Sequence, residues 1–136
     1  MENILISSCL LGVACRWHGK KCYKSGFVKK FIDNNTNIEV IGVCPEVLGG
    51  LGVPRNPVKR IKGKVFETCP EKENRKYVTG KERTDEFNRG AEEVLKIAKS
   101  LNVKTAILCK YSPSCDISGL TGKLLSNNGI EIINTF

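Results

Sequence analysis

Short, continuously apolar segments alternate with amphipathic segments along this chain. Four of the apolar segments are rich in β-branched residues and too short for most helices, so the pattern predicts four buried strands. These strands are expected at residues 3–8, 38–43, 105–109 and 130–134.

Helical patterns fill most of the sequence between the predicted strands. The clearest spans residues 84–101, where six apolar residues recur at spacings of three and four and share one helix face. Thr84 is the predicted N-cap of this helix, because a threonine hydroxyl can accept a hydrogen bond from an amide of the first turn. Residues 25–35 and 119–128 predict two shorter helices, and the second ends at an Asn-Asn-Gly stop signal.

The alternation of strands and helices predicts an α/β fold, with a mainly parallel sheet of about four strands flanked by helices. A chain of 136 residues suits one domain, which is expected over residues 1–136. Residues 54–83 break the alternation and predict a hairpin or irregular excursion, with turn-forming residues at 70–75.

The chain carries a formal net charge of +8, and the excess is concentrated in residues 55–83. This segment holds ten Lys or Arg residues against four Glu residues. Two interpretations stay open, namely a solvated basic surface or a collar that attracts an anionic ligand such as a nucleotide or RNA.

No apolar run reaches 18 residues, so no membrane-spanning segment is expected. The first residues, MENILISSCLLG, lack the basic region of a secretory signal and are interpreted as the first strand of a cytoplasmic protein. We expect a monomer or a homodimer.

The chain has seven cysteines and no C-x-x-C motif. An odd number of cysteines without a secretory signal argues against a disulfide framework, and the missing motif argues against zinc ribbons and ferredoxin-like cysteine clusters. A metal site would therefore have to be assembled from distant parts of the chain.

Three cysteines follow three of the predicted strands. Cys9 comes after the first strand, Cys44 after the second and Cys115 a short loop after the third. Ligands of open α/β sheets bind at the carboxyl ends of parallel strands, so these cysteines are expected to meet. Thiolates suit iron–sulfur clusters, zinc or copper, and a 4Fe-4S cluster held by three of them leaves one iron open to a substrate.

Two polar residues lie close to these cysteines in sequence. Glu46 is placed to act as a general acid or base, and Ser112 to hydrogen-bond a substrate or a water. The alternatives are that Glu46 merely pairs with Arg55 and that the cysteines are small core hydrophobes. His18 is interpreted as a surface loop residue. The cysteines interpreted as incidental are Cys22, Cys69 and Cys109.

Four ordered motifs are spread along most of the chain: SSCLLGVACRWHGK, VCPEVLGGLGVPR, FNRGAEEVL and SPSC. Together they resemble the thiouracil desulfidase family of bacterial domains. The resemblance implies a 4Fe-4S cluster held by Cys9, Cys44 and Cys115. It also implies that Glu46 and Ser112 form an acid/base pair.

The resemblance further implies the reaction. A thiolated pyrimidine such as thiouracil, or a related small thiocarbonyl, would be converted from C=S to C=O with release of sulfide. The substrate's sulfur would bind at the open iron, and the substrate would be a small thiolated base or nucleoside.

The chain departs from the family pattern at several positions. Asp116 stands where the family usually has glycine after SPSC, and the segment that follows is shorter. Trp17 and His18 replace the usual tyrosine and aspartate, and Cys109 stands where lysine is common. These departures lie next to the predicted site.

Two other functions are compatible with the same residues. Adding Cys15 to the three cysteines would make a structural zinc site with four thiolates, in a non-catalytic module whose basic segment, residues 55–83, binds RNA. Alternatively, Cys115 could be the nucleophile of a metal-free thiol enzyme, although the sequence places no histidine near it.

Overall fold

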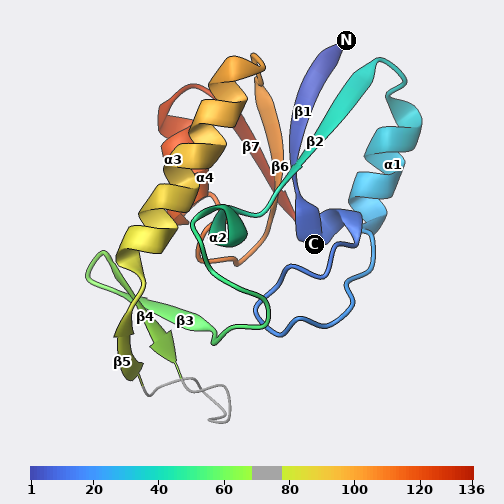
Figure 1. The fold of residues 1–136 in the computed structure, drawn as a ribbon. Coiled ribbons are helices and arrows are strands. Elements are labelled where there is room, and N and C mark those ends of the chain that lie inside the picture. The colour runs from blue at the N-terminus through green and yellow to red at the C-terminus, as the bar shows by residue number, and fades with distance from the viewer. Residues whose placement is uncertain (69–77) are drawn as a thin grey trace.

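The computed structural model describes residues 1–68 and 78–136. Its main sheet contains four parallel strands in the order β2-β1-β6-β7 (Figure 1). The strands are β1 (Glu2–Ser7), β2 (Ile38–Val43), β6 (Thr105–Cys109) and β7 (Glu131–Thr135). The predicted α/β fold with a four-stranded parallel sheet is confirmed, and each strand lies within one residue of its expected position.

The strand order determines where a ligand can enter the sheet. The chain passes from β1 to β2 on one side and later adds β6 on the other side of β1. The order therefore reverses between β1 and β6, and a crevice opens at the carboxyl ends of parallel strands where this happens.

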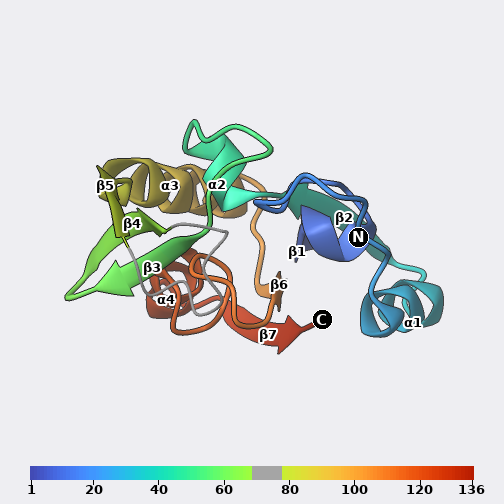
Figure 2. The same ribbon diagram turned by 90° about the horizontal axis from the view of Figure 1, so that it is seen from below.

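Three helices flank the sheet, namely α1 (Gly26–Asn34), α3 (Thr84–Ser100) and α4 (Leu120–Asn127). Figure 2 shows α1 on one side of the sheet and α3 and α4 on the other. The Ser25 side chain caps α1 by accepting a hydrogen bond from the amide of Val28. All three helices confirm the predictions from periodicity.

The prediction that Thr84 is the N-cap of α3 is wrong. Arg83 occupies the N-cap, and Thr84 is the first helical residue. The Thr84 hydroxyl instead accepts a hydrogen bond from the Val65 amide at 2.9 Å. The side chain therefore links this helix to the neighbouring strand β4 (Lys64–Thr68).

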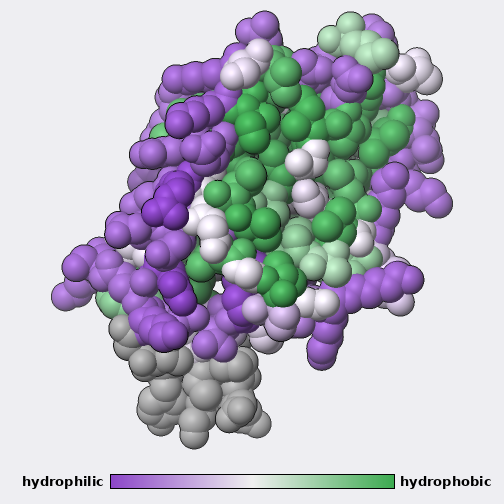
Figure 3. Space-filling view, viewed as in Figure 1, coloured by the Kyte–Doolittle hydropathy of each residue, from purple (hydrophilic) through white to green (hydrophobic). Residues whose placement is uncertain are grey.

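The core lies between the central strands and the helices. β1 and β6 supply side chains that are almost fully buried, and α3 adds Val94 and Ala98 from its apolar face. The buried strand residues are Ile4, Leu5, Ile6, Ala106, Ile107 and Leu108. Figure 3 shows apolar side chains gathered over the middle of the molecule, with hydrophilic residues along the outer side of α3.

The segment after β2 forms a small second sheet. Its strands, β3 (Val58–Ile61), β4 and β5 (Val78–Glu82), are antiparallel in the order β3-β4-β5. The predicted hairpin is therefore present and has a third strand. The turn expected at 70–75, together with Cys69, lies outside the described residues.

Two short helical elements were not predicted from the sequence. The 3-10 helix η1 (Ser8–Leu11) follows β1, and the helix α2 (Pro45–Leu48) follows β2. Each has only four residues, which is too short for a periodic pattern, although Pro45 at the start of α2 suits a first helical turn. Within the described residues, no helix is long and apolar enough to cross a bilayer.

Candidate functional site

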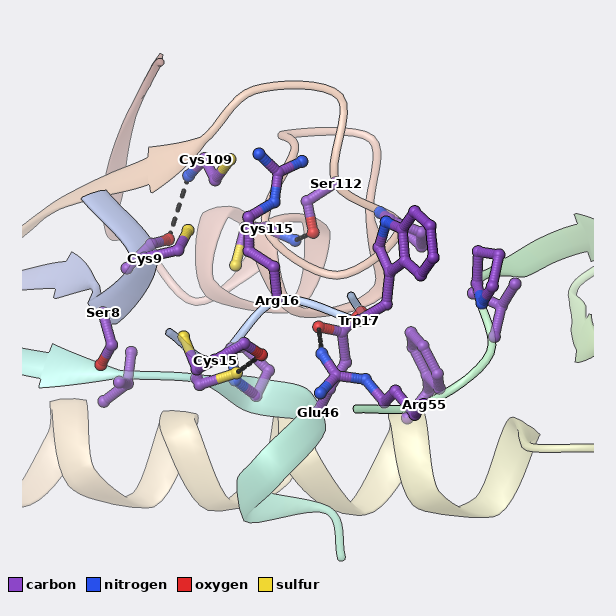
Figure 4. Close-up of a pocket in the computed structure, with 18 of the residues that line it drawn as sticks. Ser8, Cys9, Cys15, Arg16, Trp17, Glu46, Arg55, Cys109, Ser112 and Cys115 are labelled. Atoms are coloured by element: carbon purple, nitrogen blue, oxygen red, sulfur yellow. Dashed lines mark hydrogen bonds and ion pairs between the residues drawn. The ribbon is translucent and has the colours of Figure 1, made fainter. Parts of the chain in front are cut away.

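A pocket of about 130 Å³ lies at the carboxyl ends of β1, β2 and β6, as the strand order predicts (Figure 4). Cys9, Cys44 and Cys115 all line it. Glu46 and Ser112 line the same pocket. The structure therefore brings together every residue that the sequence singled out as a candidate for the site.

Each cysteine is positioned by the element that follows its strand. Cys9 lies in η1, Cys44 is the N-cap of α2, and Cys115 lies in the loop between β6 and α4. Cys115 is only 5% exposed, whereas Cys9 and Cys44 are half-buried. The three thiols thus come from separate segments of the chain that meet at the end of the sheet.

Two further cysteines, Cys15 and Cys109, line this pocket. The Cys44 thiol donates to the carbonyl oxygen of Cys15 with a sulfur–oxygen distance of 3.7 Å. Cys109 ends β6, and its amide donates to the buried Ser7 hydroxyl at 3.0 Å. The interpretation of Cys109 as incidental did not anticipate this position, although its place at a strand's carboxyl end was the available signal. Cys22 lies outside this pocket, in an adjacent hollow.

The thiols influence one another's ionisation. Burial raises the pKa of Cys115 to about 12, although a hydrogen bond with Ser7 opposes the effect. Contact with the Cys44 and Cys9 thiols lowers the pKa of Cys15. Contact with Cys15 raises the pKa of Cys44, and contacts with Cys109 and Cys15 raise that of Cys9. Neighbouring thiols therefore share protons, because several thiolates side by side repel one another.

Ser112 shapes the loop that carries Cys115. Its hydroxyl oxygen accepts hydrogen bonds from the amides of Ser114 at 3.2 Å and Cys115 at 3.1 Å. Its hydroxyl also hydrogen-bonds the Cys115 side chain and lowers the pKa of that thiol. Ser112 thus has a structural role in the turn that the sequence did not predict.

Asp116 closes the same loop from its other end. Its carboxylate accepts hydrogen bonds from the amides of Tyr111 at 2.7 Å and Ser118 at 3.1 Å. Tyr111 is held in the left-handed region at φ 63°, which a tyrosine rarely adopts. The Asp116 contacts therefore compensate for an unfavourable backbone conformation beside the pocket.

Glu46 lies in the first turn of α2 and forms an ion pair with Arg55. The Arg55 guanidinium donates to the carboxylate at 2.7 Å, and the two side chains are 10% and 17% exposed, Arg55 being the more buried. Burial raises the pKa of Glu46, and the positive charge of Arg55 opposes this shift. The pairing named as an alternative in the sequence is therefore present, inside the pocket rather than on the surface.

Two glycines allow α2 to sit directly on α3. A β-carbon on Gly90 would lie 1.9 Å from the carbonyl oxygen of Pro45, and one on Gly49 would lie 1.9 Å from that of Glu86. Only glycine at both positions permits such a close approach of two backbones. This contact explains the first glycine of the GGLG motif and the glycine of the FNRGAEE motif, and it holds α2, which carries Glu46, against α3.

The family model described as 2-thiouracil desulfurase matches residues 4–135. The chain belongs to this family.

Two relatives of this desulfurase-family chain are similar over nearly their whole length. This chain is 31% identical over 146 residues to the uncharacterized protein YbbK of Bacillus subtilis (strain 168). The alignment covers 96% of this chain and 94% of YbbK. Its fold matches the solved structure of the 4Fe-4S-dependent thiouracil desulfidase TudS with a TM-score of 0.80 and 29% identity. That match covers 98% of this chain and 91% of the other.

The donor set of this 2-thiouracil desulfurase family member fits an iron–sulfur cluster. Cysteine thiolates are the usual ligands of such clusters. Burial raises the pKa of Cys115, and hydrogen bonding with neighbouring thiols raises the pKa of Cys9 and Cys44, so a positively charged centre is needed to hold all three as thiolates.

A single metal ion and a cluster place different demands on their ligands. Within residues 1–68 and 78–136, no three cysteine, histidine or acidic side chains converge on one point as a single ion requires. Each thiolate of a 4Fe-4S cluster binds its own iron, so its ligands need not converge. The cluster and the four-thiolate zinc site therefore stay alternatives, and metal analysis distinguishes them.

Trp17 and His18, which depart from the family pattern, lie at the edge of the site. Trp17 lines the pocket, and its ring packs against His18 in an edge-on contact with centroids 5.3 Å apart. Arg16 also lines the pocket. Sequence reasoning gave no role to Arg16 or to Ser7, because neither has a signal separable from the cysteine motif around it.

Proposed function

We propose that this chain is an iron–sulfur-dependent desulfidase. It would convert the C=S group of a thiolated pyrimidine such as thiouracil, or of a related small thiocarbonyl, to C=O and release sulfide. The observation that carries the proposal is the meeting of Cys9, Cys44 and Cys115 in one pocket with the buried carboxylate of Glu46. Family membership and the fold of TudS support it.

Cys9, Cys44 and Cys115 would hold a 4Fe-4S cluster, one thiolate to each of three irons. When bound, the cluster would supply an open iron that acts as a Lewis acid toward the thiocarbonyl sulfur. The near-complete burial of Cys115 keeps bulk water away from this ligand. The hydroxyls of Ser7 and Ser112 lower the pKa of this thiol and so favour its thiolate form, against the effect of burial.

Glu46 is the proposed general base. Its carboxylate would take a proton from a water molecule while the water oxygen attacks the carbon that carries sulfur. A C–O bond forms and the C–S bond breaks, and the protons of the water leave with the sulfur as hydrogen sulfide. The overall change is a hydrolysis without net oxidation or reduction.

Arg55 keeps the Glu46 carboxylate in its ionised form and in one orientation. A buried carboxylate without a partner would take up a proton and lose its basicity. The distance of 2.7 Å between a guanidinium nitrogen of Arg55 and a carboxylate oxygen of Glu46 brings the two opposite charges into direct contact. Ser112 would assist Glu46 by orienting the water or the substrate, since its hydroxyl lies on the same pocket wall as Cys115.

The proposed partner is a small thiolated base or nucleoside. RNA binding by the basic segment 55–83 stays a prediction, as do the cytoplasmic location and the monomeric or homodimeric state.

Anaerobic purification followed by iron, sulfide and zinc analysis tests the proposal. We expect about four irons and four sulfides per chain, a visible absorption band of the cluster, and sulfide release from thiouracil. The Cys22→Ser variant is a matched control, because Cys22 lies outside the pocket. About one zinc per chain without iron would reject the desulfidase proposal in favour of the zinc-stabilised module.

A further inference from the structure

Trp17 occupies the side of the pocket opposite several of the thiols. In Figure 4 its indole lies between Ser112 and Arg55, away from the sulfur atoms of Cys9 and Cys109. The side chain is half-buried and borders both the pocket and a shallow hollow beside it. It therefore lies between the pocket that holds Glu46 and the neighbouring hollow.

The surrounding chain holds Trp17 in place. Its carbonyl oxygen accepts a hydrogen bond from the Arg55 amide at 2.7 Å, so the loop carrying Trp17 is tied to the segment carrying Arg55. The edge-on contact with His18, at an interplanar angle of 68°, supports the ring. Gly19 adopts a positive φ, and a β-carbon there would lie 3.3 Å from that of Pro54, so the end of this loop runs close to Pro54. The indole is thus positioned before any substrate arrives.

We propose that Trp17 is the stacking platform for the planar ring of the substrate. This inference rests on the proposed desulfidase function. In the proposed binding mode, the ring of the substrate lies against the indole and its thiocarbonyl group is directed toward the cysteines. Bases stack on aromatic side chains whatever their substituents, because every base has a π-face. Trp17 therefore selects aromatic heterocycles over acyclic thiocarbonyl compounds.

The expected size of the effect follows from base–aromatic stacking. Replacing a stacking residue by alanine weakens binding by about 5- to 150-fold per base. Because stacking persists from the bound substrate to the transition state, the loss should be seen in KM and not in kcat.

Steady-state sulfide release from thiouracil by the cluster-loaded protein tests the inference. Trp17→Ala should raise KM by about 5- to 150-fold and leave kcat within about threefold, whereas Trp17→Phe should stay close to the parent because it keeps an aromatic face. Tyr23→Ala is the matched control, since Tyr23 is an exposed aromatic residue outside this pocket. An unchanged KM for Trp17→Ala, or a fall in kcat alone, would overturn the stacking role.

Trp17→Leu guards against a folding defect. It keeps an apolar side chain without a π-face, so it should match Trp17→Ala in KM while its iron content and melting temperature match those of Trp17→Phe. If Trp17→Leu and Trp17→Phe had equal KM values, bulk rather than stacking would be responsible and the inference would fail.

Binding can also be measured without turnover. Trp17 is the only tryptophan in the chain, so its fluorescence reports directly on the pocket. Titrating the loaded protein with uracil, the oxygen-containing product, should change this fluorescence saturably, and no change would count against the inference. A parent protein that holds its cluster but releases no sulfide would instead contradict the proposed function, so the two failures are distinguishable.

Discussion

The guanidinium of Arg55 lies 2.7 Å from the carboxylate of Glu46, and both side chains are largely buried. The two residues come from different segments, since Glu46 lies in α2 and Arg55 in the loop before β3. This ion pair links the wall that carries Cys44 to the wall that carries Trp17, because the Arg55 amide also donates to the Trp17 carbonyl. Arg55 therefore both pairs with the proposed general base and holds the loop that carries Trp17.

Replacing Glu46 by glutamine should abolish most turnover while leaving the cluster in place. The amide keeps the shape of the side chain but cannot accept a proton, and a general base typically contributes about 10²- to 10⁴-fold to the rate. The measurement is sulfide release per bound cluster, with iron content determined on the same sample. A Glu46→Gln variant that remains active would remove Glu46 from the mechanism.

Replacing Arg55 by methionine should destabilise the fold through the carboxylate it leaves behind. Removing one partner of a largely buried ion pair costs about 2–4 kcal/mol, because the carboxylate left behind must either keep an uncompensated charge in a low-dielectric site or take up a proton. The Glu46→Gln/Arg55→Met double variant should recover much of this loss, since it buries no charge. Urea unfolding of the four proteins measures the coupling, and simple additivity of the two single changes would show that the pair contributes little.

Single cysteine-to-serine substitutions should show which cysteines are ligands of the proposed cluster and which are not. Loss of Cys9, Cys44 or Cys115 should lower the iron and sulfide content sharply, because serine is a poor ligand for such clusters. Cys22→Ser should keep the parent content. Cys15→Ser distinguishes the two metal models, since an open cluster does not need Cys15 whereas a four-thiolate zinc site does. Metal analysis of each variant after anaerobic purification gives the result.

Replacing Gly90 by alanine should displace α2 from its contact with α3. Its β-carbon would lie 1.9 Å from the Pro45 carbonyl oxygen, so the two helices would have to separate. We expect a loss of about 3 kcal/mol, and a melting temperature lower by about 10 °C. Activity should fall further than stability alone requires, because Glu46 follows Pro45 in α2.

Gly26→Ala is the control for this substitution. A β-carbon on Gly26 would meet no atom within 4 Å, and the residue begins α1. Alanine there should leave the melting temperature unchanged or raise it slightly. Equal behaviour of the two variants would show that the α2–α3 contact does not control the site.

Local sequence patterns were sufficient to predict the regular elements of the main sheet and its helices. Residues 105–109 form a strand and residues 84–100 a helix because hydrophobic spacing reflects which face of each element is buried. The parallel arrangement followed from the alternation of strands and helices. The parallel arrangement in turn predicted that Cys9, Cys44 and Cys115 lie at one end of the sheet. In the structure all three line the pocket at that end.

Only the tertiary structure decided which other side chains share that end. Cys15 and Cys109 join the thiols, Arg55 reaches Glu46, and Trp17 closes the far side of the pocket. These contacts depend on the paths of irregular loops, and such loops have no periodicity from which a sequence pattern can be read. The contact between Gly49, which follows α2, and Gly90 in α3 could not be predicted for a similar reason. A close approach of two backbones depends on both segments, so neither segment's sequence shows it alone.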